Sequence, residues 1–372
     1  MAFAYMNTCI YLNGRFLAQR TTGVQRYALE TLRALDELFD EPAHRNDIVV
    51  TLLVPPGAEP PPLRNIATRT IGQGSGQLWE QLWLPLYARD GILLSFAATG
   101  PLVLRRQVVT LHDASVYAVP NAFSWKFRAW YKLLMPWMAH RNPQTMTVSE
   151  FSRNELARYL RVKKERLHVS GEGWEHATRT PSDPDVLQQH GLQDRGYVLA
   201  VSSLSPHKNF EVVARAIADL PPGSIQVVVA GGMNERVFGN ATPSTLHNLK
   251  RVGYVTDAQL RALYEHAAAF VYPSTYEGFG LPPLEAMALD CPVIAARAAS
   301  MPEVCGDAAL YFPPHDSAKL KELMLALLQN ADLRETQIRK GRALLQQHSW
   351  RGAACEHLAL LREVATATTL RA

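Results

Sequence analysis

The segment Tyr276-Glu277-Gly278-Phe279-Gly280-Leu281-Pro282-Pro283-Leu284-Glu285-Ala286-Met287 contains two glutamates with seven residues between them. Its first half is interrupted by glycines and predicts a loop. Its second half predicts a helix, because two prolines suit a first helical turn, where N–H groups have no partner in any case. The N–H groups of Gly280 and Leu281 are then expected at a helix start, where the helix dipole favours an anion.

Two interpretations of this segment are open. A sugar nucleotide has an anionic diphosphate between two hydroxyl-bearing sugars, so Glu277 and Glu285 have the chemistry to bind one sugar each. Alternatively, the segment is a turn followed by an amphipathic helix whose glutamates are solvated.

Length and composition limit the classes of protein. A chain of 372 residues suggests two domains, and 47% hydrophobic with 19% charged residues is typical of a globular protein. The net charge of +4 fits an anionic ligand or an acidic membrane surface but does not indicate a nucleic-acid partner.

The cysteines and the apolar runs predict the compartment. Four cysteines without a Cys-x-x-Cys motif argue against a zinc site or a disulfide framework and favour a reducing compartment. No apolar run approaches the roughly 18 residues that span a bilayer, and no signal peptide is evident. We therefore expect a cytoplasmic protein.

The first half of the chain alternates strand and helix patterns, which predicts a parallel, doubly wound α/β sheet. Gly23 opens a helix after the first strand and can approach a phosphate or a substrate closely. His112 follows the buried strand 107–111, and ligands of such sheets bind at the carboxyl ends of strands. An ordinary turn at Gly23 and a structural role for His112 are the alternatives.

A tryptophan-rich segment, residues 124–139, carries Trp125, Trp130 and Trp137 among lysines and arginines. This pattern is compatible with a helix at a membrane interface. The alternative, which we favour, is a surface helix that buries its aromatic side chains in the core of its domain.

The second half repeats the α/β alternation after a polar, proline-containing segment, 178–184, which we expect to be a linker. Lys208 follows the strand 197–201 and precedes a helix, so it can reach a diphosphate as a point charge. Asp183 and Asp185 have the spacing of a metal-binding aspartate pair, but no buried strand precedes them, and we expect no metal site.

Taken together, these motifs make the chain resemble the family 4 retaining glycosyltransferases, which have the GT-B fold. The resemblance covers nearly the whole chain and is strongest over residues 196–312. The motifs are the Glu-x7-Glu segment at 274–288, Pro292-Val293-Ile294-Ala295, Met301-Pro302-Glu303-Val304, Gly306-Asp307-Ala308-Ala309, Lys208-Asn209, Gly253-Tyr254-Val255-Thr256-Asp257, Thr22-Gly23-Val24 and His112-Asp113.

The resemblance implies two Rossmann-like domains whose parallel sheets face each other across a cleft. Residues 1–177 are expected to bind the acceptor and residues 178–349 the nucleotide sugar. A C-terminal helix, about 350–372, is expected to cross back onto the first domain.

The resemblance also implies site residues. His112, Glu277 and Lys208 are the expected catalytic residues: His112 lies near the reacting sugar, Glu277 holds hydroxyls of the donor hexose, and Lys208 binds the diphosphate. Glu285 is expected to bind the ribose, and the backbone of Val255 the base. The full set of expected donor-binding residues is Gly23, Ser202, Lys208, Val255, Glu277, Phe279, Gly280, Leu281 and Glu285.

One position departs from the family pattern. Many relatives carry an arginine six positions before the lysine or directly beside it, whereas this chain has Ser202 and His207 there. Diphosphate binding is then expected to depend on Lys208 with backbone N–H groups, or on a protonated His207.

The implied reaction moves a hexose from a nucleoside diphosphate to a glycan or lipid-linked glycan, with retention of the anomeric configuration. Our first expectation for the donor is GDP-mannose. A double displacement needs two carboxylates about 5 Å apart that flank the reacting bond. The resemblance places Glu277 at the far hydroxyls of the sugar instead, so we favour front-face attack in which the leaving diphosphate takes the acceptor proton.

The alternatives are a GT-B-type sugar-nucleotide epimerase or phosphorylase, and a catalytically silent glycan-binding homologue. We expect no metal or other cofactor. Peripheral contact with the inner face of the cytoplasmic membrane is compatible with a lipid-linked acceptor and stays open at this point.

Overall fold

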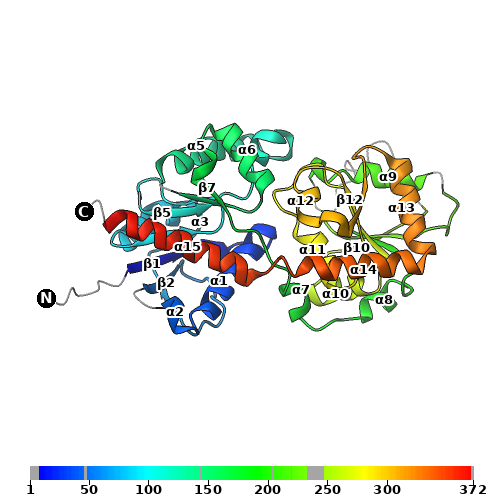
Figure 1. Cartoon of the computed structure of the whole chain (residues 1–372), viewed down its shortest axis with the longest axis horizontal. Coiled ribbons are helices and arrows are strands. Elements are labelled where there is room, and N and C mark those ends of the chain that lie inside the picture. Colours follow the sequence, from blue (N-terminus) through cyan, green and yellow to red (C-terminus); the bar gives the residue numbers. More distant parts are fainter. Residues whose placement is uncertain are drawn as a thin grey trace. The chain divides into compact units, whose positions relative to one another are not determined.

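The computed structural model describes residues 8–45, 48–142, 144–202, 205–218, 220–232 and 247–369. The chain divides into two compact units (Figure 1). The first contains Met1–Ala118, Phe123–Glu172 and Trp350–Ala372, and the second contains Val119–Ala122 and Gly173–Ser349. The C-terminal helix α15 (Trp350–Thr369) packs on α1 (Gly23–Leu38) within the first unit, so its predicted return to the first domain is confirmed.

The first unit is built on a seven-stranded parallel sheet with the order β3-β2-β1-β4-β5-β6-β7. Its strands are β1 (Thr8–Asn13), β2 (Ile48–Val54), β3 (Ala67–Thr70), β4 (Ile92–Ser95), β5 (Gln107–Thr110), β6 (Thr145–Thr147) and β7 (Leu167–Val169). Its other helices are η1 (Gly14–Ala18), α2 (Pro42–Arg45), α3 (Gly76–Tyr87), α4 (Ser115–Ala118), α5 (Trp125–Arg141), α6 (Glu150–Leu160) and η3 (Lys164–Arg166).

Helices cover both faces of this sheet, as β5 demonstrates. Val109 packs in a core cluster with Leu134 of α5, whereas the hydroxyl of the next residue, Thr110, contacts His357 of α15. Successive side chains of a strand point to opposite faces. The four residues of β5 are therefore all buried. This explains why Val108 and Val109 are both apolar and do not alternate with exposed polar residues.

The second unit repeats this architecture with a six-stranded parallel sheet of order β10-β9-β8-β11-β12-β13. Its strands are β8 (Val198–Ser202), β9 (Val227–Gly231), β10 (Leu249–Gly253), β11 (Ala269–Tyr272), β12 (Val293–Ala296) and β13 (Ala309–Phe312). Its helices are η2 (Pro120–Ala122), α7 (His176–Arg179), α8 (Asp185–Gln189), η4 (Pro206–Lys208), α9 (Phe210–Ala218), α10 (Asp257–Glu265), α11 (Leu281–Ala288), α12 (Met301–Cys305), η7 (Gly306–Ala308), α13 (Ser317–Gln329) and α14 (Ala331–Leu345).

The strand orders fix where each unit can bind a ligand. The order reverses between β1 and β4 in the first unit and between β8 and β11 in the second. In open parallel sheets a crevice forms at this point, outside the carboxyl ends of the two strands. The loops that leave β8 and β11 carry Lys208 and Glu277, respectively.

Two local features differ from the expectations. β3 is an edge strand whose four residues, Ala67–Thr70, are all exposed, so no apolar pattern identifies it. Residues 178–184, expected to be a linker, lie within the second unit and are held on α10. Arg261 donates hydrogen bonds to the carbonyls of Thr178 (2.7 Å) and Thr180 (3.0 Å).

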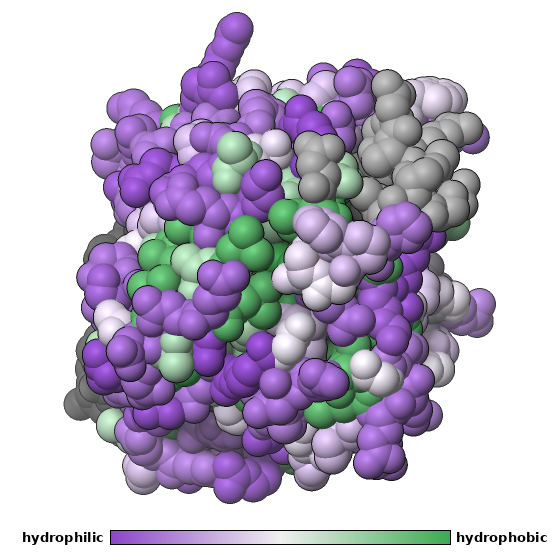
Figure 2. All heavy atoms as spheres, turned by 90° about the vertical axis from the view of Figure 1, so that its right-hand side faces the viewer, coloured by the Kyte–Doolittle hydropathy of each residue, from purple (hydrophilic) through white to green (hydrophobic). Residues whose placement is uncertain are grey.

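Among the described residues, no helix is long and apolar enough to cross a bilayer. The face of the molecule in Figure 2 is mainly hydrophilic, with an apolar area near its centre.

Candidate active site

In the second unit, two loops meet where the strand order reverses. The 3-10 helix η4 follows β8, and residues 273–280 follow β11. The carbonyl of His207 accepts hydrogen bonds from the N–H (2.8 Å) and the hydroxyl (3.1 Å) of Thr275. These bonds join the loop that carries Lys208 to the loop that carries Glu277.

Asn209, the residue after Lys208, is suited to its position by both its backbone and its side chain. Its backbone is left-handed, with φ of 54°, a conformation that asparagine tolerates better than most residues. Its side-chain amide donates to the carbonyls of Pro273 (3.1 Å) and Pro314 (2.7 Å). Asn209 therefore ends η4 and ties it to two further loops, which fixes the position of Lys208.

Lys208 and Glu277 form an ion pair. The Lys208 Nζ lies 2.6 Å from the Glu277 Oε1, and the hydroxyl of Ser274 donates to the same oxygen. Burial opposes ionisation of Glu277, but the charge and the hydrogen bond of Lys208 outweigh it and lower the pKa of Glu277 below its usual value. Glu277 is therefore ionised at neutral pH.

The start of α11 matches the prediction from the sequence. Gly280 is the residue before the helix, with φ of 112°, and a Cβ atom there would lie 2.3 Å from the Cε of Met301. Only glycine fits this position. The N–H groups of Gly280 and Leu281 have no acceptor within the helix, and the prolines that follow them have no N–H. This helix start can therefore bind an anion.

Ser300 holds the loop before α11 in place. Its buried hydroxyl lies 2.7 Å from the carbonyl oxygen of Phe279 and 3.1 Å from that of Glu277. The Phe279 ring is itself buried and packs edge-on against His348, with centroids 5.7 Å apart. The Phe279 ring is therefore part of the core. Its expected contact with the sugar nucleotide would have to involve the backbone.

Glu285 has partners that the sequence did not indicate. Its Oε1 lies 2.9 Å from the Nε2 of His176 in α7, and its Oε2 lies 3.5 Å from the hydroxyl of Tyr264 in α10. His176 precedes Glu285 by 109 residues, and no local pattern marks it. The carboxylate expected to bind the ribose is thus oriented by two other helices.

Two expected donor-binding residues are placed only by their elements. Val255 is half-buried in the turn between β10 and α10. Ser202 is the last residue of β8, and its side chain lies outside the described part of the structure. Among the described residues, Val255 has no side-chain hydrogen bond or ion pair that bears on its expected role.

In the first unit, His112 follows β5 and is held by the residue that follows β4. Its Nε2 lies 2.8 Å from the carbonyl oxygen of Phe96, so this nitrogen carries a proton. Burial lowers the pKa of His112, although the hydrogen bond to Phe96 and the charge of Asp113 oppose the shift. The ring is therefore neutral at pH 7, and its Nδ1 is a hydrogen-bond acceptor.

The C-terminal helix α15 supports His112 indirectly, through Tyr27 of α1. Tyr27 packs edge-on against the His112 ring at 4.7 Å, and its hydroxyl lies 3.2 Å from the Nε2 of His357. His357 donates from its Nδ1 to the carbonyl of Ala353 at 2.8 Å, so its Nε2 accepts from Tyr27. Burial lowers the pKa of His357 to about 4. The sequence did not indicate this support, because α15 lies more than 200 residues from His112.

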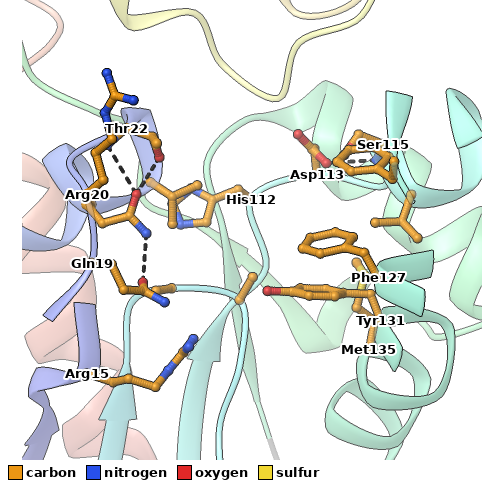
Figure 3. Close-up of a pocket in the computed structure, with 16 residues that line it drawn as sticks. Arg15, Gln19, Arg20, Thr22, His112, Asp113, Ser115, Phe127, Tyr131 and Met135 are labelled. Carbon is orange, nitrogen blue, oxygen red and sulfur yellow. Dashed lines mark hydrogen bonds between the residues drawn. The ribbon is translucent and has the colours of Figure 1, made fainter. Parts of the chain in front are cut away.

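A cavity of about 550 Å³ opens beside His112 (Figure 3). This volume is in the usual range for small-molecule sites. On one side, α5 contributes Phe127 and Tyr131, whose rings are stacked 4.2 Å apart. On the other side lies Gln19. Its side-chain oxygen accepts a 2.9 Å hydrogen bond from Gln25, which also lines the cavity. The cavity thus combines an aromatic wall with a polar one.

Arg15, which lines the cavity, belongs to a buried ion pair. The Arg15 Nε lies 3.0 Å from the Glu80 Oε1, and both side chains are buried. Thr99 donates to the same carboxylate oxygen at 2.9 Å. The charge of Arg15 also lowers the pKa of Tyr131, but burial, the larger effect, raises it, so the phenol remains a donor. None of these residues was expected from the sequence, since each belongs to a different element.

Gly23 begins α1 next to this cavity. A Cβ atom at Gly23 would meet no protein atom within 4 Å, and its φ is not in the left-handed region. Nothing within the first unit therefore requires a glycine here. The neighbouring Thr22 and Gln25 line the cavity and cap the helix through a hydrogen bond from the Thr22 N–H to the Gln25 side chain (3.2 Å).

The described ranges contain no group of three or more side chains with the chemistry to hold a metal ion. Asp183 accepts a hydrogen bond from the N–H of Asp185 (3.3 Å) at the start of α8. This contact forms a turn.

Comparisons with known proteins identify relatives of this chain. Residues 183–344 match the family model described as glycosyl transferases group 1. An O-antigen chain mannosyltransferase B from Escherichia coli is 33% identical over 264 residues, which cover 67% of this chain and 68% of that protein. The O-antigen chain mannosyltransferase RfbU from Salmonella typhimurium is 26% identical over 313 residues, covering 81% and 85%.

Solved structures share the fold. A sucrose-phosphate synthase from Thermosynechococcus elongatus aligns with a TM-score of 0.74 over 97% of this chain and all of that chain, at 17% identity. WaaG, a glycosyltransferase involved in lipopolysaccharide biosynthesis, aligns with a TM-score of 0.67 over 95% and 99%, at 14% identity. At these identities the likeness extends to the fold alone.

Proposed function

Because the chain belongs to the group 1 glycosyltransferases and has the GT-B fold, we propose that it transfers mannose from GDP-mannose to a glycan or lipid-linked glycan. Two relatives that cover most of the chain are named O-antigen chain mannosyltransferases, which supports mannose as the sugar and a polysaccharide as the acceptor. No relative described above is named an epimerase or a phosphorylase, and the comparisons do not support those alternatives.

The observation that carries the proposal is the Lys208–Glu277 pair beside the start of α11. A sugar diphosphate presents its anion and its hexose side by side. Lys208 and the N–H groups of Gly280 and Leu281 offer donors to the anion, and Glu277 offers acceptors to the sugar hydroxyls. In the donor complex the ammonium group exchanges part of its contact with Glu277 for the diphosphate.

The remaining donor contacts follow from the same arrangement. Glu285, oriented by His176, accepts a hydrogen bond from a ribose hydroxyl, because a carboxylate has lone pairs beyond those used by its protein partners. The backbones of Val255 and Phe279 contact the base and the phosphates. Ser202, at the end of β8, completes the proposed donor residues of the second unit. Gly23, in the first unit, stays an expectation from the resemblance.

The proposed reaction is a front-face displacement with retention. The bond from the anomeric carbon to the diphosphate oxygen breaks, the bond to the acceptor oxygen forms on the same face, and the acceptor proton passes to the leaving phosphate. Preorganised charge at a leaving group is commonly the largest catalytic contribution. Lys208 and the start of α11 supply that charge in this chain.

His112 acts in the proposal through its neutral ring. A neutral imidazole whose Nε2 donates to Phe96 can accept a hydrogen bond at Nδ1 from a sugar hydroxyl. The cavity beside it, with its aromatic and polar walls, is suited to an acceptor sugar, whose ring has both C–H and O–H groups.

The reaction as written needs no metal, because Lys208 and backbone N–H groups neutralise the leaving diphosphate. Transfer should therefore continue in the presence of EDTA, with a transferase that requires magnesium as the positive control for chelation. We place the reaction in the cytoplasm, at the inner face of the membrane, where a lipid-linked acceptor is accessible.

A donor screen tests the proposal. Ligands that bind the folded state raise its apparent stability, so GDP-mannose should raise the melting temperature more than UDP-, ADP- or dTDP-sugars. Incubation of GDP-mannose with a mannose-terminated oligosaccharide should then give an extended product with an α-linkage, observed by NMR. Release of free mannose or of an epimerised nucleotide sugar, without an extended product, would contradict transfer.

A further inference from the structure

Exposed apolar side chains are concentrated in one part of the first unit. Among the described residues, eight of the ten large exposed apolar side chains lie between positions 78 and 137. One of the eight, Phe127, lines the cavity described above. The other seven, which we call the apolar face, are Leu78, Leu82, Leu86, Val103, Trp125, Leu133 and Trp137.

These residues belong to segments that adjoin one another. The leucines of α3 are spaced four residues apart, so they form one stripe along the helix. Gln81 of α3 bonds through its side chain to the carbonyl of Gly100 and the N–H of Leu102, both at 2.9 Å. The indole of Trp137 in α5 donates to the carbonyl of Leu102 at 3.0 Å. The loop that carries Val103 therefore connects α3 to α5.

The charge around the apolar face is of one sign. The helix α5 has four lysines and arginines and no acidic residue. Lys126 lies over the ring of Trp125 at 5.7 Å, and Arg141 lies over that of Trp137 at 4.9 Å. The one carboxylate of α3, Glu80, is buried and paired with Arg15. The apolar side chains are thus accompanied by exposed cations alone in these helices.

We propose that the apolar face docks the first unit onto the surface of an anionic lipid bilayer. Leucine and tryptophan side chains enter the headgroup region, and the lysines and arginines beside them contact lipid phosphates. The proposal depends on the function proposed above only in that a lipid-linked acceptor lies in such a bilayer. The contact itself is a property of the surface and needs no substrate.

The charge favours a bilayer over a second copy of the chain. In a symmetric dimer the same patch of each subunit meets itself. Lys126 and Arg141 would then face a patch of the other subunit whose exposed charges in α3 and α5 are also cations, which is unfavourable. An anionic bilayer neutralises these cations instead.

The exposure of each side chain decides which residues are suitable for a mutational test. Trp130, one of the three tryptophans of this helix, packs against the core cluster that includes Leu134, as the favoured interpretation of the sequence expects. Leu82 and Leu133 are better positions, because both are 60% exposed and their side chains have no polar bond to lose. Val49, an exposed residue of β2 that lies outside the apolar face, is a matched control.

The test is co-sedimentation with vesicles made of equal parts phosphatidylcholine and phosphatidylglycerol. The wild-type chain should bind these vesicles and bind pure phosphatidylcholine vesicles weakly. The double variant Leu82→Gln/Leu133→Gln should bind at least about tenfold more weakly, since two apolar side chains no longer enter the lipid. Val49→Gln should bind like the wild type, and Lys126→Glu/Lys132→Glu should lose the preference for anionic lipid.

Equal binding of the double variant and the wild type would overturn the proposal. It would also be overturned if the wild type were a dimer by light scattering and the same double variant were a monomer. Transfer from GDP-mannose to a soluble oligosaccharide should be unchanged in the double variant, because neither leucine belongs to the candidate active site. Failure of soluble transfer in the wild type would count against the proposed function and leave the vesicle result intact.

Discussion

The ammonium group of Lys208 lies 2.6 Å from the carboxylate of Glu277, although 69 residues separate them in the chain. The residue expected to hold the donor diphosphate is therefore paired with the residue expected to hold the donor sugar. Lys208 lowers the pKa of Glu277, and Asn209 and Ser274 fix the two loops around the pair. In the proposed function, this pair arranges the expected donor-binding groups before a donor binds.

Removing the cation should abolish most of the transfer. In Lys208→Ala the leaving diphosphate loses its main charge partner, so turnover should fall about a hundredfold to a thousandfold. The measurement is the initial rate of mannosyl transfer at saturating GDP-mannose. Lys319→Ala is the matched control, because Lys319 forms a 2.6 Å pair with Glu322 on the exposed side of α13. Near-normal turnover in Lys208→Ala would remove Lys208 from the mechanism.

Removing the partner of Glu285 should weaken donor binding. In His176→Ala the carboxylate loses its 2.9 Å contact and is no longer held in one orientation. The KM for GDP-mannose should rise by about tenfold, with a smaller change in kcat, because a ribose contact is present in both the ground and transition states. His176→Gln, which keeps a donor at this position, should recover part of the affinity. An unchanged KM in both variants would contradict a ribose-binding role for Glu285.

Two glycines should respond differently to alanine. Gly280→Ala meets Met301 and has an unfavourable φ, so the free energy of unfolding should decrease by about 1–3 kcal/mol. Gly23→Ala meets no protein atom and should leave stability nearly unchanged. If a donor or acceptor approaches Gly23 closely, this variant should nevertheless transfer more slowly. Thermal unfolding and transfer rates of both variants are the measurements, and normal transfer by Gly23→Ala would exclude a close contact there.

The stability of the first unit should depend on His357 below neutral pH. The pKa of His357 is lowered by burial from 6.5 to about 4. Between these values the unfolded chain binds a proton that the folded chain does not, so stability decreases as pH falls from 6.5 towards 4. The full shift in the pKa of His357 corresponds to about 3 kcal/mol of unfolding free energy.

His357→Gln should reduce this pH dependence, measured as the difference between the urea midpoints at about pH 7 and about pH 4.5. His112 contributes in the same direction, since burial lowers its pKa as well, so part of the slope should remain. An identical slope in the wild type and the variant would show that His357 is not kept neutral by the fold. Glu356→Gln, on the same helix but outside the core, is the control.

Local signals were sufficient for much of the donor half of the site. Glycine and proline positions located the start of α11, because these residues restrict the backbone whatever surrounds them. The alternation of strands and helices placed Lys208 and Glu277 after two parallel strands. The roles given to Ser202, Val255 and Gly23 remain predictions, as does the meeting of His112 with the donor residues.

Most of the cavity beside His112, proposed above to bind the acceptor, was not indicated by the sequence. Arg15, Glu80 and Tyr131 come from three elements, and each has a common structural role when considered alone. The same holds for α5, where the sequence favoured a helix that buries its tryptophans. Trp130 does pack on the core, but Trp125 and Trp137 are exposed, because the helical period directs neighbouring tryptophans to different sides.

The sequence by itself therefore determined the features that depend on local backbone restriction and on periodicity: two parallel α/β units, the helix start at Gly280, and the placement of charged residues at strand ends. Tertiary structure decided which of these residues have partners. The pairing of Lys208 with Glu277, of His176 with Glu285, and of His357 with Tyr27 depends on strand order and helix packing. Such contacts join residues far apart in the chain, so no pattern within one segment can specify them.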